Sequence, residues 1–323
     1  MGAHLCKPRM LPRLILVSIP THARLDTRFD DISAAAATIV GDVARTISFG
    51  VGRSNAEDAS QPLLDDDDAW READMKAYRQ KAEARLGTVG SGNHDVDLLR
   101  DEEGFVWIGV HFGSRGLGHS SATRYLKAAG GEDGINVPPA VVDEDSELGR
   151  RYIAAMTLAG RYAFAGREWV VERVRRILGG VISEVVHNHH NYAWRETHDG
   201  RDLWVVRRGA TPAFPGRKGF VGGSMGDDAG ILEGLDSPRA RASLHSAMHG
   251  AGRLHGRKEA KRRFTRNEMK QWLKAQSPPR HPDRRRSRRK PDGLSASARR
   301  AGPSHRLRPR RPYAAPLWRG DGR

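Results

Sequence analysis

The stretch LGTVGSGNHDVDLLRDEEGFVWIGVHFGSRGLGH, residues 86–119, is the part of the chain around which the rest is organised. Its apolar run at residues 106–110 is typical of a short buried strand. One glycine-rich turn precedes His94, and a second follows His111 where the expected strand ends. Glycine lets a backbone approach a ligand closely, and the serine and arginine of the second turn suit phosphate oxygens. The stretch therefore indicates a site for a metal ion and a phosphate group.

Turns that carry histidine recur further along the chain, in HNHHNY at residues 187–192 and in MHGAGR at residues 248–253. A lone histidine beside a turn is more often structural than functional, but four histidines in similar settings favour a functional interpretation. Neutral imidazoles bind Mn, Fe, Co or Zn, usually together with carboxylate or thiolate ligands. His249 lies in a glycine-rich turn, the exposed setting expected of a nucleophile, because an imidazole nitrogen can carry a phosphoryl-type group.

Six strings, in this order and at plausible spacing, resemble the motifs of the RtcB family of RNA ligases. They are GTVGSGNH (87–94), HFGSRGLGH (111–119), HHN (189–191), RRGATPAFPG (207–216), GGSMG (222–226) and HGAGR (249–253). Six ordered motifs are far more specific than any single one. The resemblance implies a mixed α/β (α+β) fold, with a single catalytic domain of central β-sheets and surrounding helices. The alternation of expected strands and helices favours the same class.

The resemblance implies an enzyme that uses GTP and two Mn²⁺ ions to join an RNA 3′-phosphate, or 2′,3′-cyclic phosphate, to a 5′-hydroxyl, as in tRNA splicing or RNA repair. His249 matches the family histidine that attacks the α-phosphate of GTP and becomes guanylylated. Three residues match the family's metal ligands: His94, His111 and His190. The positions that match its nucleotide site are Asn93, Asp97, Asn191, Ser224, Met225, Gly250, Ala251 and Gly252. RNA ends, GTP and an archease-like activator are the implied partners.

The sequence departs from the family pattern upstream of these motifs. The family has a D-x-x-C segment that supplies two metal ligands, whereas the only cysteine here is Cys6 and the first aspartate is Asp26. A first metal ion would then keep only His94, and a second only His111 and His190. Two other functions stay open: a non-catalytic relative that binds RNA or nucleotide without turnover, and a mononuclear metallohydrolase of phosphoesters that uses the same three histidines.

Composition divides the 323 residues into an atypical segment at 1–24, a ligase-like domain at 25–276 and a basic tail at 277–323. The net charge is +16, and the tail alone holds 15 Lys and Arg residues against 3 Asp. Arg, Pro and Ser dominate the tail without an apolar period, which predicts disorder. Altered reading frames at both ends, or an RNA-binding arm at the C-terminus, are the two interpretations. One cysteine and the lack of a long apolar run predict a cytoplasmic protein without membrane contact.

Periodicity predicts the secondary structure around the motifs. Expected strands lie at residues 106–110, 203–206 and 229–234, and expected helices at 32–47, 69–86, 121–129 and 148–178, the last broken near Gly160 or Gly166. The aspartates at residues 65–68 favour a helix start over a metal site, because adjacent carboxylates do not converge on one ion. A solvated face is expected for the arginines of the last helix: Arg150, Arg151, Arg161, Arg167, Arg173, Arg175 and Arg176.

Overall fold

A computed structural model describes residues 3–6, 18–57, 59–90, 94–132, 140–223, 228–250, 257–265, 267–268, 271 and 308–321. The helices are α1 Phe29–Ile32, α2 Ala36–Thr46, α3 Asp67–Glu72, α4 Arg79–Glu83, α5 Leu117–Ala128, α6 Glu147–Leu178, α7 Pro238–Ala242 and α8 Arg257–Arg263. Short 3₁₀ helices are η1 Ser33–Ala35, η2 Pro62–Asp65 and η3 Lys76–Tyr78. The strands are β1 Ala3–Cys6, β2 Ser18–Arg28, β3 Asp95–Arg100, β4 Phe105–Gly113, β5 Ile182–His187, β6 Asn191–His198, β7 Arg201–Arg208, β8 Ala210–Pro212, β9 Lys218–Val221, β10 Ala229–Glu233, β11 Ser246–Met248 and β12 Arg308–Asp321.

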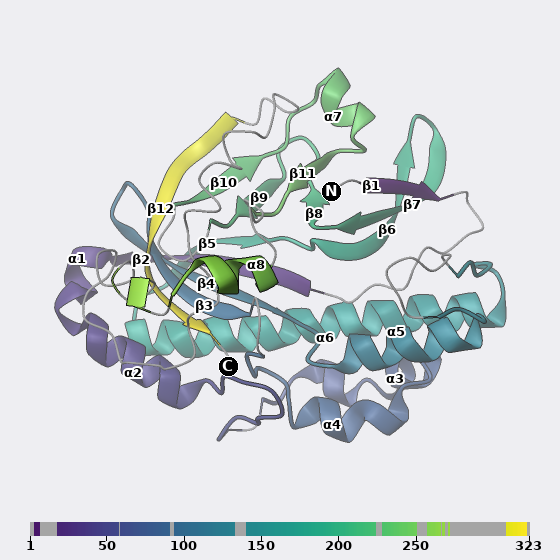
Figure 1. Cartoon of the computed structure of the whole chain (residues 1–323), viewed down its shortest axis with the longest axis horizontal. Coiled ribbons are helices and arrows are strands. Elements are labelled where there is room, and N and C mark those ends of the chain that lie inside the picture. The colour runs from purple at the N-terminus through teal and green to yellow at the C-terminus, as the bar shows by residue number, and fades with distance from the viewer. Residues whose placement is uncertain are drawn as a thin grey trace.

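Ten of the described strands form one sheet, in the order β1-β7-β6-β2-β4-β3-β12-β10-β9, with β5 paired to β2. Strands β8 and β11 form a separate two-stranded sheet. Every pairing between these named strands is antiparallel. Helices α5 and α6 lie side by side along one side of the strands (Figure 1). The mixed α/β class that the sequence predicts is confirmed.

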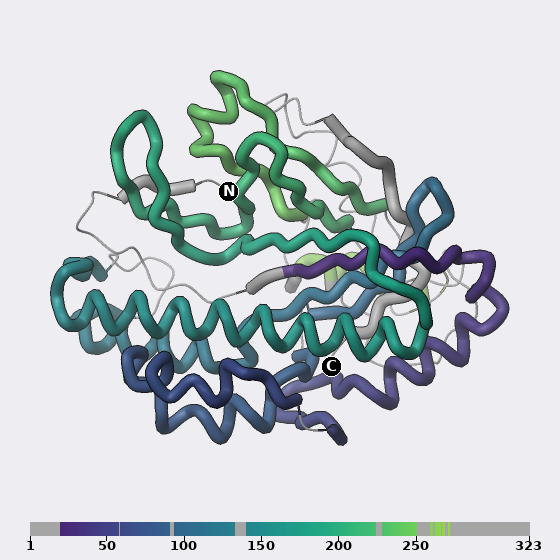
Figure 2. Tube along the Cα trace, turned by 180° about the vertical axis from the view of Figure 1, so that it is seen from behind, coloured from purple at the N-terminus to yellow at the C-terminus, as the bar shows by residue number. Residues whose placement is uncertain are grey.

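Strand β4 lies between the main apolar core and the opposite face of the sheet, which carries His111, because successive residues of a strand point to opposite faces. Alternate residues from Val106 to Phe112 belong to the main core, and α6 packs against β2 and β4 to close it. Trp107 lies in a second, smaller cluster on the other face, and His111 shares that face by the same alternation. Figure 2 shows α6 running the length of the molecule between the strands and the shorter helices α2, α3 and α4.

Helix α6 continues without the interruption that the sequence predicts near its glycines. The two glycines instead permit close packing. A Cβ at Gly160 would lie 3.0 Å from the Tyr192 ring, and one at Gly166 would lie 3.2 Å from the backbone nitrogen of Gly87. The cost of about 1 kcal/mol for a glycine inside a helix is thus offset by contacts that a larger side chain would prevent.

The helix expected over residues 69–86 is instead divided into α3, η3 and α4. The chain reverses at Asp74, which has a left-handed φ of 50°, and a helix cannot pass through such a residue. The aspartate run before it is structural, as predicted: the Asp66 side chain accepts a hydrogen bond from the Ala69 amide and pairs with Arg161 at 2.8 Å. Asp65 and its neighbours also pair with Arg79.

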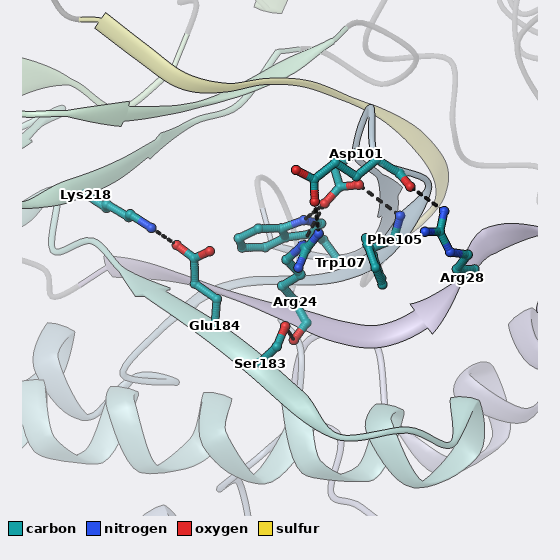
Figure 3. Close-up of polar contacts among 9 residues, drawn as sticks. Arg24, Arg28, Asp101, Phe105, Trp107, Ser183, Glu184 and Lys218 are labelled. Atoms are coloured by element: carbon teal, nitrogen blue, oxygen red, sulfur yellow. Dashed lines mark hydrogen bonds and ion pairs between the residues drawn. The ribbon is translucent and has the colours of Figure 1, made fainter.

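The β3–β4 hairpin is fixed by the buried carboxylate of Asp101 (Figure 3). One carboxylate oxygen accepts the Phe105 amide at 2.8 Å, and the other accepts Arg24 Nε at 2.8 Å and Trp107 Nε1 at 3.0 Å. These bonds lower the pKa of Asp101 even though burial acts in the opposite direction. Because Arg24 belongs to β2, the carboxylate joins the hairpin to the centre of the sheet.

Both ends of the chain contribute strands. Strand β2 runs through the boundary expected between residues 24 and 25, and it lies inside the sheet, paired with β4 and β5. Within the tail at 277–323, residues 308–321 are described as β12, which pairs with β3 and β10. Among the described residues, no helix combines the length and apolar character that a bilayer crossing requires.

Candidate functional site

The four histidines that the motifs single out lie next to one another, although they come from four different parts of the chain. His94 directly precedes β3, His111 lies on β4, His190 lies between β5 and β6, and His249 follows β11. Ring centroids are 6.4 Å apart for His94 and His111, and 5.0 Å apart for His111 and His190. The rings of His190 and His249 are stacked, with centroids 4.1 Å apart and an interplanar angle of 13°.

A glycine brings the first two motifs into contact. A Cβ at Gly90 would lie 1.9 Å from Arg115 Nη1 and 2.5 Å from His94 Nδ1, so only glycine leaves room for both groups. Arg115 Nε donates to Thr88 Oγ1 at 3.0 Å, which holds the guanidinium in this place. A guanidinium beside an imidazole at a glycine turn can bind phosphate oxygens next to a metal ligand or a nucleophile.

Two buried carboxylates lie on the same face of the sheet as His111. In the β3–β4 pairing Asp95 lies opposite His111, and Asp97 lies opposite Gly109. Gly109 has no side chain, and a Cβ there would lie 3.3 Å from Asp97 Cβ and 3.0 Å from the His22 ring. The site therefore combines imidazoles with carboxylates. Asp97 is one of the residues assigned by resemblance to the nucleotide site.

The turn that begins at Gly209 joins the last two histidines. Its amide donates to the carbonyl of His190 at 2.6 Å, and its backbone also hydrogen-bonds the ring of His249. Gly209 has a left-handed φ of 76°, which favours glycine at this position. A bridge between Gly222 and Gly250 brings the GGSMG string beside the HGAGR string. Motifs far apart in the sequence thus meet around His249.

Burial keeps the imidazoles of His190 and His249 neutral. It lowers the pKa of His190 well below the usual value, and the charge of nearby groups, His249 and Arg167 among them, acts in the same direction. The pKa of His249 is also lowered by burial, against an opposing effect of the hydrogen bond to Gly209. The neighbouring His189 has its pKa lowered to about 3 by burial. A neutral imidazole has a free lone pair, which both a metal ligand and a nucleophile require.

The described residues suit a metal ion in their chemistry but do not complete a ligand set. The Nδ1 atoms of His190 and His249 are buried, and no hydrogen-bond partner for either is found in the structure that the described residues make. Within the same residues, no three histidine, cysteine, aspartate or glutamate side chains are spaced to hold one ion. Further ligands would have to come from a bound phosphate or from the rest of the chain.

The remaining residues assigned by resemblance divide into two groups. Asn191 is the first residue of β6 and lies half-buried one residue after His190, and Gly250 follows His249. The others lie outside the described residues: Asn93, Ser224, Met225, Ala251 and Gly252.

One arginine of α6 is not on the solvated face that the sequence predicts. Arg167 is completely buried, where its Nε donates to Thr21 Oγ1 at 2.9 Å and its Nη1 donates to the carbonyl of Phe112 at 3.1 Å. Burial lowers its pKa to about 9. Helical spacing could have revealed this, because Arg167 lies four residues after Ala163 and three before Val170, both of which are core residues. Several of the other arginines pair with surface carboxylates, as a solvated face implies.

The chain matches the family described as tRNA-splicing ligase RtcB over residues 15–287. It is 34% identical over 197 residues to the RNA-splicing ligase RtcB of Escherichia coli strain K12, an alignment that covers 56% of this chain and 48% of that protein. It is 31% identical over 283 residues to the tRNA-splicing ligase RtcB of Pyrobaculum aerophilum, an alignment that covers 72% of this chain and 58% of that protein. It is 35% identical over 251 residues to the tRNA-splicing ligase RtcB of Thermococcus kodakarensis, an alignment that covers 62% of this chain and 52% of that protein. The chain spans about half the length of the curated relatives it matches.

Proposed function

Because the chain belongs to the RtcB family of tRNA-splicing ligases, we propose that it is an RNA ligase that joins a 3′-phosphate or 2′,3′-cyclic phosphate end to a 5′-hydroxyl end. GTP is the proposed energy source and His249 the proposed nucleophile. The observation that carries the proposal is the stacking of His249 on His190 in one cluster with His111 and His94. RNA ends and an archease-like activator are proposed partners, and the cytoplasm is the proposed location.

The first proposed step is attack by a ring nitrogen of His249 on the α-phosphorus of GTP. A P–N bond forms, the P–O bond to the β-phosphate breaks, and pyrophosphate leaves with the electron pair. Burial supports this role because it keeps the imidazole unprotonated at neutral pH. Arg115, beside Gly90, would bind and orient phosphate oxygens. The RNA 3′-phosphate, formed by hydrolysis where the end is a 2′,3′-cyclic phosphate, then attacks the guanylyl phosphorus, which breaks the P–N bond and releases His249. The 5′-hydroxyl attacks the activated 3′-phosphate, the phosphodiester forms, and GMP leaves with the electron pair.

Mn²⁺ is the proposed metal, and its ligands here would include His94, His111 and His190. When bound, such ions would supply Lewis-acid neutralisation of the phosphate oxygens. The support for this proposal is the neutral, buried imidazole of His190, whose lone pair can bind a metal ion, and the nearness of the His111 and His94 rings. Asp97, Asn191 and Gly250 remain proposed contacts of the guanine nucleotide, together with the matching positions outside the described residues.

The proposal is tested by incubating the full chain with Mn²⁺ and GTP labelled at the α-phosphate. We expect an acid-labile label on His249, absent from the H249Q variant. The matched control is H119Q, because His119 is exposed on α5 and outside the histidine cluster. A folded chain that binds Mn²⁺ but forms no adduct would indicate the non-catalytic relative. Hydrolysis of a phosphoester without GTP would indicate the metallohydrolase instead.

A further inference from the structure

The most completely bonded buried charge in the described part of the chain is Arg207, the residue two positions before Gly209. Its side chain has no exposed surface. Nη1 and Nη2 donate to the two carboxylate oxygens of Glu196 at 2.6 and 2.9 Å. Nε donates to Ser246 Oγ at 2.8 Å, and Nη2 also donates to the carbonyl of Leu244 at 2.7 Å. The guanidinium therefore holds strands β6 and β7 to the segment that precedes His249.

The acid in this network is also buried and shared. Only 9% of the Glu196 side chain is exposed, and it also hydrogen-bonds His198 Nε2 at 2.8 Å. The Arg207 guanidinium lies 5.0 Å from the centre of the Trp194 ring, which covers one of its faces. A buried bidentate pair of this kind fixes direction as well as distance, because both planar groups must be aligned.

The segment that Arg207 holds has an unfavourable backbone. Leu244 and His245 have φ values of 53° and 45°, and a non-glycine residue in the left-handed region costs on the order of 1 kcal/mol or more. Such a turn persists only where surrounding contacts determine it. Here those contacts include the bond from Arg207 to the Leu244 carbonyl and the bond from Ser246 Oγ to the same carbonyl at 3.1 Å. Strand β11 follows at once and ends one residue before His249.

Arg207 also lies next to the segment that contacts His249 from the opposite direction. It lies near the end of β7, and the chain continues through Gly209 into β8. Strand β8 pairs with β11, so that Ala210 lies opposite Met248. The guanidinium thus fixes both the turn that delivers His249 and the strand that delivers Gly209. We propose that Arg207, together with Glu196, is a positioning residue that sets the His249 ring against Gly209 and His190. This inference rests on the proposed function of His249 as nucleophile.

The first test measures the guanylylation rate of the R207K variant. Lysine keeps the charge but cannot make the aligned pair with Glu196. We expect the maximal rate to fall by about 100-fold, because a misplacement of about 1 Å costs on that order, while the half-saturating GTP concentration changes by less than about 3-fold. E196Q, which keeps the size of the acid, should give a smaller loss of the same kind. R208K is the matched control, since Arg208 is the exposed neighbour on β7.

The second test does not need ligase activity. Diethyl pyrocarbonate acylates neutral imidazoles, and peptide mass spectrometry reports the rate at each histidine. We expect His249 to react several-fold faster in R207K than in the wild type, with exposed His119 unchanged as an internal standard. If the proposed function is wrong but the positioning role is right, the wild type will not be guanylylated, yet His249 will still be acylated faster in R207K than in the wild type.

A stability control separates positioning from simple weakening of the fold. Y162F removes a buried hydroxyl that donates to the Ala82 carbonyl at 2.7 Å within the main apolar core. It should lower the melting temperature without changing the reactivity of His249. If R207K melts earlier but His249 keeps the wild-type acylation rate well below the melting temperature, Arg207 supports only the fold and the inference is wrong.

Discussion

Replacing Gly90 by alanine separates the geometry of the site from the stability of the fold. Alanine places a Cβ 1.9 Å from Arg115 Nη1 and 2.5 Å from His94 Nδ1, whereas ordinary contact begins at 3.4 Å. The guanidinium must therefore move by about 1.5 Å and the imidazole by about 0.9 Å. Gly90 has an ordinary φ, so the new side chain adds no backbone strain. The effect of the substitution comes from displaced side chains alone.

The two consequences of this displacement differ in size. Overpacking costs typically 1–3 kcal/mol, and the lower end applies here because the end of an arginine side chain can swing aside. A displacement of about 1 Å at the reacting groups, however, costs on the order of 100-fold in rate. We expect G90A to melt only a few °C lower than the wild type and to form the His249 adduct about 100 times more slowly.

The measurements are thermal unfolding followed by circular dichroism and single-turnover labelling with GTP and Mn²⁺. The matched control is G230A, because Gly230 also has an ordinary φ and has no heavy atom within 4 Å of the added Cβ. Wild-type labelling by G90A, with G230A equally active, would show that Arg115 and His94 do not need to meet at Gly90. A large loss of stability in G90A would show that the clash spreads into the core.

Three further predictions concern charge, stability and metal binding. Burial lowers the pKa of His189 to about 3, so as the pH falls His189 is protonated in the unfolded chain before it is protonated in the folded chain. The free energy of unfolding should therefore fall as the pH drops from about 6.5 toward 3, by at most about 1.4 kcal/mol per pH unit. Urea unfolding at pH 7 and pH 5 measures this fall, and an equally steep fall in H189Q would contradict the lowered pKa of His189. His187, with its pKa lowered to about 4, should add a smaller effect because its ring is partly exposed. Y162F should lower the free energy of unfolding by about 0.5–1.5 kcal/mol, since it removes a buried hydrogen bond while the Ala82 carbonyl keeps the Arg85 amide as a donor, and unchanged urea midpoints would contradict that bond. H190A should weaken Mn²⁺ binding in a titration followed by electron paramagnetic resonance, and an unchanged titration would exclude His190 as a ligand.

The sequence predicts best those parts of the molecule whose patterns are local. The apolar period of α6 and the glycine turns around His94 and His111 are readable because each depends on neighbouring residues. The family resemblance, and not periodicity, predicts that the four histidines lie close together. They are brought together by pairing between strands that are far apart in the sequence, which no local pattern reveals.

Other features depend on partners that are distant in sequence. Strand β2 lacks a clear alternation because both of its faces are covered: Thr21 bonds Arg167 on one face, and His22 stacks on Phe220 on the other. A polar residue that is satisfied by a distant partner looks like a surface residue in a local pattern. The same reason hides the buried state of Arg207, whose acceptors lie 11 and more residues away in the chain.

The histidine cluster has a consequence for biosynthesis. The hairpin that holds His111 leaves the ribosome early. His249, whose ring stacks on His190, is synthesised later, because it follows β11 toward the end of the matched region. Contacts between such distant positions form late, because a long loop must close before they give any stabilisation. A nascent chain therefore carries an incomplete histidine cluster until its last strands arrive, and a product that terminates before residue 249 would lack the proposed nucleophile.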